Sequence, residues 1–98
     1  MTIKKTKDGD KLTIAVEGRI DTVTAKEFEQ SAVSELDGVT QLTLDFSQLN
    51  YISSAGLRVL LLLQKTMNKQ GAMKVTGVNE TVRDIFEVTG FSEILTVE

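Results

Sequence analysis

A pair of serines separates two apolar segments in the middle of this chain, and this arrangement constrains the fold more than any other feature. Residues 42–49 form an apolar run that is typical of a strand and its exit, and residues 59–63 form a leucine-rich run that is typical of a helix. Ser53 and Ser54 stand between the two. A strand that turns into a helix here indicates an α/β domain, and it places two hydroxyl groups at a helix N-terminus, where backbone N–H groups lack partners.

The rest of the chain continues this alternation of strands and helices. The order ββαβαβαβ predicts a mixed, mostly parallel sheet in one small domain spanning residues 1–98, with the helices mainly on one side. The expected first helix begins after Asp21 or Thr22 and runs to about Leu36, where Asp37-Gly38 ends it. The other expected elements are strands at 3–7, 11–17, 41–45 and 72–76, helices at about 55–69 and 80–88, and a short strand or extended tail at 94–97.

The composition excludes several kinds of chemistry. The 98 residues include no cysteine and no histidine, so disulfides, thiolate metal sites and the commonest general base are absent. No Gly-Lys-Ser/Thr phosphate-binding loop occurs. We therefore expect no cofactor and no bound metal.

Charge and hydropathy limit the partners and the location. The net charge of −3 argues against a nucleic-acid partner, which would require a basic surface. No apolar stretch approaches the roughly 20 residues that cross a bilayer. The first ten residues are polar and contain no secretory signal, so we expect a cytoplasmic protein with no membrane contact.

The leucine-rich helix is expected to have two different sides. At about 100° per residue, one side combines Ser54, Arg58, Leu61, Leu62 and Lys65. The other side holds the residues assigned to the core, which are Val59, Leu60, Leu63 and Met67. Either a neighbouring segment covers the two leucines, or they contact another protein on a surface that is apolar in its middle and basic at its edge.

Three roles compete for the serines: helix cap, nucleophile and phosphate acceptor. A cap is the ordinary role of a serine before a helix. Catalysis is disfavoured because a Ser-His-Asp triad needs a histidine and because Ile52 stands where a nucleophile elbow has glycine. A phosphate is compatible with this helix end because the first turn contains no carboxylate and is lined by the small residues Ala55 and Gly56.

Two aspartates are expected close to the serines. Asp21 and Asp45 each follow a predicted strand, so both can lie beside Ser54 and orient a partner or hold Mg²⁺ transiently. Alternatively, they are solvated acids or helix caps.

The chain resembles the STAS domain family, and more narrowly the bacterial anti-sigma factor antagonists. The resemblance covers nearly the whole chain. Four segments carry it, namely residues 17–21 (EGRID), 44–49 (LDFSQL), 51–60 (YISSAGLRVL) and 86–91 (FEVTGF).

The resemblance implies a phosphorylation-switched antagonist without catalytic activity. Such a protein binds an anti-sigma factor that is also a GHKL-type ATP-dependent serine kinase, and binding releases the sigma factor. Phosphorylation of a serine in this loop breaks the complex, and a PP2C-type phosphatase restores it. The loop match assigns the acceptor to Ser54, and it adds Asp21 to the kinase-facing surface.

One departure from the family pattern concerns Ser53. Many of these antagonists have Asp at this position, so Ser53 is a rival acceptor. The expected partner-binding residues are Asp21, Ser53, Ser54, Arg58, Leu61 and Leu62. The alternatives are a non-switching STAS scaffold and a module that binds a small anion or nucleotide.

Overall fold

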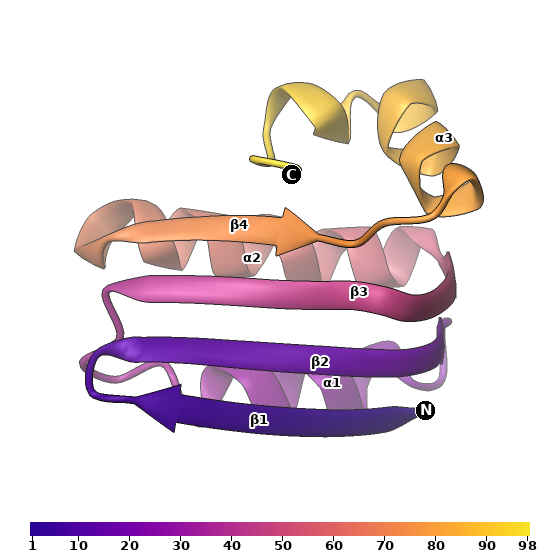
Figure 1. Ribbon diagram of the computed structural model, residues 1–98. Helices are drawn as coiled ribbons and strands as arrows, with labels where there is room; N and C mark the ends of the chain where they lie inside the picture. Colours follow the sequence, from indigo (N-terminus) through magenta and orange to yellow (C-terminus); the bar gives the residue numbers. More distant parts are fainter.

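A four-stranded sheet forms the centre of the computed structural model, which describes residues 1–98 (Figure 1). The strands lie in chain order. β1 pairs antiparallel with β2 through a tight hairpin, and the pairs β2–β3 and β3–β4 are parallel. The predicted mixed, mostly parallel sheet is therefore confirmed. The strands are β1 (Thr2–Asp8), β2 (Lys11–Ile20), β3 (Gln41–Ile52) and β4 (Ala72–Thr76).

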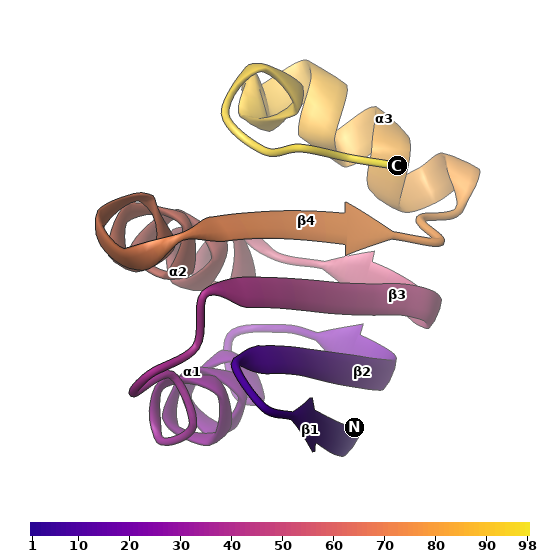
Figure 2. The ribbon, with the colours of Figure 1, turned by 60° about the vertical axis from the view of Figure 1, so that its left-hand side comes forward.

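The two helices that connect the parallel strands cover the same face of the sheet (Figure 2). These are α1 (Ala25–Val33) and α2 (Ser54–Gln70). A third helix, α3 (Glu80–Thr89), and the short 3-10 helix η1 (Phe91–Glu93) lie beyond the β4 edge (Figure 1). The opposite face of the sheet carries no helix, which confirms the expectation that the helices lie mainly on one side.

The hydrophobic core lies between the sheet and the helices α1 and α2. Phe28 of α1 and Phe46 of β3 are fully buried and meet edge to face, with ring centroids 6.4 Å apart. Alternate β2 residues point into the core. The four α2 residues that the helical period assigned to the core are all buried, namely Val59, Leu60, Leu63 and Met67.

The strand β3 is much longer than predicted because it contains two bulges. Relative to β2, it has one additional residue after Asp45 and another after Leu49. Each bulge shifts the alternation by one, so the buried positions Phe46, Leu49 and Ile52 are three residues apart. The prediction that this strand ends at Asp45 is therefore wrong, because the strand continues to Ile52. The alternation of buried and exposed residues by which a strand is recognised in a sequence breaks down at each bulge.

Smaller differences occur at the other element ends. β2 extends to Ile20 rather than ending at Glu17, and a turn delays the start of α1 to Ala25. The expected final strand forms only one β-bridge, between Val75 and Val97, with two hydrogen bonds of 2.8 Å. This tail is anchored by Leu95, which is buried.

The first turn of α2 packs directly onto the ends of β2 and β3 through Gly56. A methyl group placed on Gly56 would lie 2.6 Å from Cγ1 of Ile52 and 2.7 Å from Cγ2 of Ile20. Both isoleucines are buried, so they have little room to move. The absence of a side chain at Gly56 therefore allows the helix to begin against the sheet.

We predict that Gly56→Ala destabilises the protein by about 1–3 kcal/mol, because the added methyl overpacks the contact with the two isoleucines. Without that contact the same change would stabilise the helix by about 1 kcal/mol, since alanine is the better helix former. The sign of the change in the free energy of unfolding, measured by urea denaturation, separates the two cases. A stabilised Gly56→Ala variant would contradict the packing described here.

Candidate functional site

The serine pair lies at the junction of β3 and α2. β3 ends at Ile52, Ser53 is the N-cap, and Ser54 is the first residue of α2. The N–H of Ser53 donates to the carbonyl oxygen of Ile20 at 2.8 Å, which ties the junction to the end of β2. The predicted serine loop is thus a single residue, and the sheet holds both serines in place.

The two serine side chains differ in their hydrogen bonding. Ser53 has extended backbone angles (φ −88°, ψ 174°), and its Oγ accepts the N–H of Gly56 at 3.3 Å. It is therefore the helix cap, and it is partly buried. Ser54 is exposed, and its hydroxyl makes no hydrogen bond within the protein. Of the two hydroxyls, only that of Ser54 is both accessible and free of a structural role.

Asp21 organises the turn between β2 and α1. Its Oδ1 accepts the N–H groups of Val23 at 3.0 Å and Thr24 at 2.9 Å, and it lies 3.1 Å from the Thr24 hydroxyl. The N–H and the hydroxyl of Thr24, in that order, are the main causes that lower the pKa of Asp21 below its ordinary value. Asp21 therefore caps the turn that leads into α1, which was one of its two predicted roles. Only its Oδ1 takes part in these bonds.

Asp45 does not lie beside the serines. It is in the middle of β3, seven residues before the strand ends, and this separation corresponds to roughly 23 Å along an extended strand. Its Oδ1 accepts the N–H of Ser47 at 3.0 Å. The expectation that Asp45 joins Asp21 near Ser54 is wrong, and the reason is the unpredicted extension of β3.

The outward side of α2 presents two cations and two leucines. Arg58 and Lys65 are exposed and form no ion pair. Leu62 is 41% exposed, and Leu61 is half-buried. No other segment of the chain buries this side fully, which excludes the alternative that a neighbouring element covers both leucines.

Two exposed side chains at the end of β2 and in the turn after it were not anticipated. The guanidinium of Arg19 lies 4.5 Å from the centre of the Tyr51 ring, and the two residues are paired in the β2–β3 register one step before the junction. Val23, in the turn that Asp21 caps, is 84% exposed. The Arg19–Tyr51 pairing depends on the bulged register of β3, so a pattern that ended this strand at Asp45 could not reveal it.

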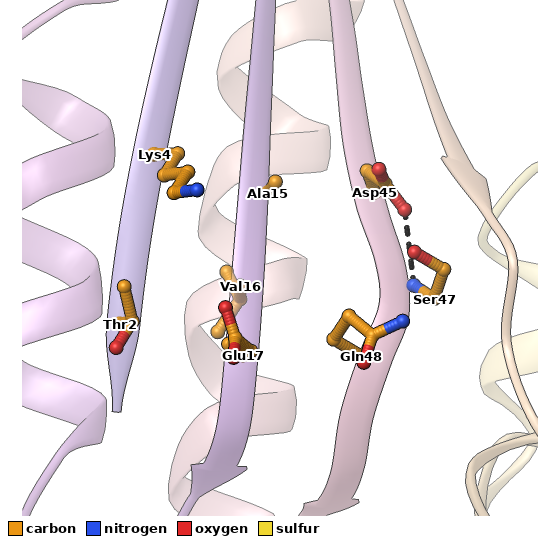
Figure 3. Close-up of a pocket in the computed structure, with 8 residues that line it drawn as sticks. All are labelled: Thr2, Lys4, Ala15, Val16, Glu17, Asp45, Ser47 and Gln48. Carbon is orange, nitrogen blue, oxygen red and sulfur yellow. Dashed lines mark hydrogen bonds between the residues drawn. The ribbon is translucent and has the colours of Figure 1, made fainter.

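The cavities of the molecule lie away from the serines. One, of about 170 Å³, opens on the helix-free face of the sheet beside the first β3 bulge, and its lining includes Lys4, Glu17 and Asp45 (Figure 3). The other, of about 250 Å³, lies between β3, β4 and the C-terminal tail. Neither is lined by Ser53 or Ser54, so no preformed pocket supports the alternative of an anion or nucleotide site at this helix end.

Two further features bear on the class of site. No group of three or more acidic side chains comes together in a way that could hold a metal ion. None of the helices has the length and apolar character needed to span a bilayer.

The family model of the STAS domain matches residues 2–98. A Bordetella bronchiseptica protein, BtrV, named as a candidate anti-sigma factor antagonist, is 35% identical over an alignment of 88 residues that covers 88% of this chain and 76% of the relative. The anti-sigma-B factor antagonist of Listeria monocytogenes is 28% identical over 96 residues, covering 96% of this chain and 84% of that protein.

Solved structures of the anti-sigma factor antagonist SpoIIAA share the fold. The unphosphorylated form is 16% identical, with a TM-score of 0.85 over 99% of this chain and 88% of that one. The phosphorylated form, from Bacillus, is 15% identical, with a TM-score of 0.76 over 99% of this chain and 91% of that one.

We predict that the carboxyl of Asp21 titrates below the ordinary aspartate value of about 3.9. Because hydrogen bonding lowers this pKa in the folded state, the carboxylate stabilises the protein at neutral pH, and this contribution is lost as the pH falls through the lowered value. Carbon-detected NMR titration measures the pKa directly. Thr24→Val removes one donor and should raise the Asp21 pKa, while a wild-type value at or above about 3.9 would contradict the capping role.

Proposed function

Because this chain belongs to the STAS domain family, we propose that it is an anti-sigma factor antagonist. In this role the protein binds an anti-sigma factor, which then releases its sigma factor. It is a regulatory binding protein and not an enzyme. The names of the Bordetella and Listeria relatives support this function.

The proposed partner is an anti-sigma factor with GHKL-type serine kinase activity. It transfers the γ-phosphoryl group of ATP to a serine oxygen of this chain, so that a new P–O bond forms, the bond to ADP breaks and the hydroxyl proton is released. A PP2C-type phosphatase hydrolyses the phosphate and restores binding. SpoIIAA is known in phosphorylated and unphosphorylated forms, which supports such a switch. The proposed setting is the cytoplasm, where ATP and the transcription machinery are found.

The observation that carries the choice of acceptor is the unequal hydrogen bonding of the serines. The Ser53 hydroxyl caps α2, so its modification would disturb the helix end. Ser54 is exposed and its hydroxyl is uncommitted. Ser54 is therefore the proposed acceptor, and its phosphorylation leaves the cap intact.

The proposed docking face surrounds Ser54 at the end of the sheet and continues along α2. Leu61 and Leu62 supply its apolar part, and Arg58 supplies a positive charge at the edge. Asp21 lies at the start of the neighbouring turn. The docking face comprises Asp21, Ser53, Ser54, Arg58, Leu61 and Leu62.

Phosphorylation would change the electrostatics of this face without unfolding the domain. A phosphoserine adds roughly −1.5 to −2 charges and three acceptor oxygens. At an exposed position in the first turn of a helix, the domain itself tolerates the anion. An interface pressed against Ser54 would have to desolvate the same charge, which strongly opposes binding.

We predict that a cognate anti-sigma factor kinase and ATP add one phosphate to this protein, and that Ser54→Ala abolishes its incorporation. Ser53→Ala should still accept phosphate, while losing about 1 kcal/mol of stability through the missing cap. Intact mass and peptide sequencing by mass spectrometry give both the amount and the position. Phosphate located on Ser53 or elsewhere in the wild-type protein would overturn the assignment, and unaltered partner binding by Ser54→Asp would favour a non-switching scaffold.

We further predict that Leu62→Lys weakens binding of the unphosphorylated protein to the anti-sigma factor by at least about tenfold. A lysine places a charge where an apolar side chain is expected to be desolvated, and tenfold corresponds to about 1.4 kcal/mol. Val88→Lys is the matched control, since Val88 is 87% exposed on α3, outside the docking face. Isothermal titration calorimetry measures both affinities, and equal effects of the two substitutions would remove Leu62 from the interface.

A further inference from the structure

Arg58 is a cation without a partner on a helix that contains no acid. α2 has 17 residues, and none of them is Asp or Glu. On a helix, side chains three and four positions apart are neighbours. The neighbours of Arg58 on its exposed side are therefore Ser54, Ala55, Leu61 and Leu62, and Ser54 is the only one that can acquire a negative charge.

The usual direction of side chains on a helix favours an approach of Arg58 to Ser54. Side chains on an α-helix lean toward its N-terminus and lie over the preceding turn. Ser54 lies four residues before Arg58, on the same side of α2, and both are exposed. A long side chain at position 58 thus reaches back toward position 54, whereas a side chain at position 65 is two helical turns farther away.

The Ser53 cap of α2 bears on which groups can bind a phosphate on Ser54. The Gly56 N–H at the start of α2 is already bonded to the Ser53 hydroxyl. This N–H is therefore not free for a phosphate on Ser54, whereas a guanidinium matches a phosphate because two of its N–H groups can bind two phosphate oxygens at once. At the end of β2 and in the turn after it, Arg19 and Asp21 carry opposite charges, and the guanidinium of Arg19 is stacked over the Tyr51 ring at 4.5 Å.

We propose that Arg58 is an intramolecular receptor for the phosphate on Ser54, so that phosphorylation both adds an anion to the docking face and withdraws a cation from it. This inference rests on the proposed function for its biological setting. The pairing itself requires only a phosphate on Ser54, whatever enzyme places it there. In the unphosphorylated protein Arg58 remains free to contact an acidic or carbonyl group of the partner, and in the phosphorylated protein it is occupied.

The test uses full-length protein with phosphoserine incorporated at position 54 during translation, so no kinase is required. Phosphorus NMR titration measures the second pKa of the phosphate, which is ordinarily about 6. Since a nearby cation favours the dianion, Arg58→Gln should raise this pKa by about 0.3–0.7 relative to the otherwise unchanged phosphoprotein. Lys65→Gln removes the same charge from the same side of α2 and should change it by less than about 0.1.

The pairing would be overturned if Arg58→Gln left the phosphate pKa unchanged, or if Lys65→Gln raised it equally, because the effect would then be one of overall charge. Arg58→Lys should keep the second pKa of the phosphate partly lowered, since lysine keeps the charge but loses the bidentate contact. The measurement is independent of the proposed function: a Ser54 that no cellular kinase modifies would refute the switch but leave the Arg58 titration result intact.

Discussion

The contact between Gly56 and the ends of β2 and β3 is the constraint on which the site depends. With no side chain at this position, the first turn of α2 reaches van der Waals distance of Ile20 and Ile52. The helix then starts one residue after the strand ends, and Ser53 can bond both to the Ile20 carbonyl and to the Gly56 N–H. A bulkier residue would clash with the two isoleucines, so the start of the helix would have to shift relative to the sheet.

Hydrogen bonds then divide the polar groups at this edge into structural and available ones. The Ser53 hydroxyl and Oδ1 of Asp21 are used to cap the starts of α2 and of the turn before α1. The Ser54 hydroxyl and the Arg58 guanidinium have no such role. A phosphate added to Ser54 therefore meets a rigid scaffold and a free cation, so the surface can change while the fold stays the same.

The family and the buried face of α2 could be predicted from the sequence, because four motifs and a regular helical period lie within local stretches. β4 was also predicted with its observed bounds. The errors that affect the site trace mainly to β3. The two bulges of β3 break its alternation, which hid seven strand residues, placed Asp45 near the serines and concealed the pairing of Arg19 with Tyr51. Bulges are set by pairing between distant segments, which local patterns do not contain.

We propose that the charge on Ser54 decides whether this chain binds an anti-sigma factor. The most direct measurement is the dissociation constant of the cognate anti-sigma factor for two samples that differ only at this position, one with serine and one with phosphoserine, at the same ionic strength. Phosphoserine should weaken binding at least about 100-fold, which corresponds to about 2.7 kcal/mol. Equal affinity of the two samples would show that the charge on Ser54 does not control binding.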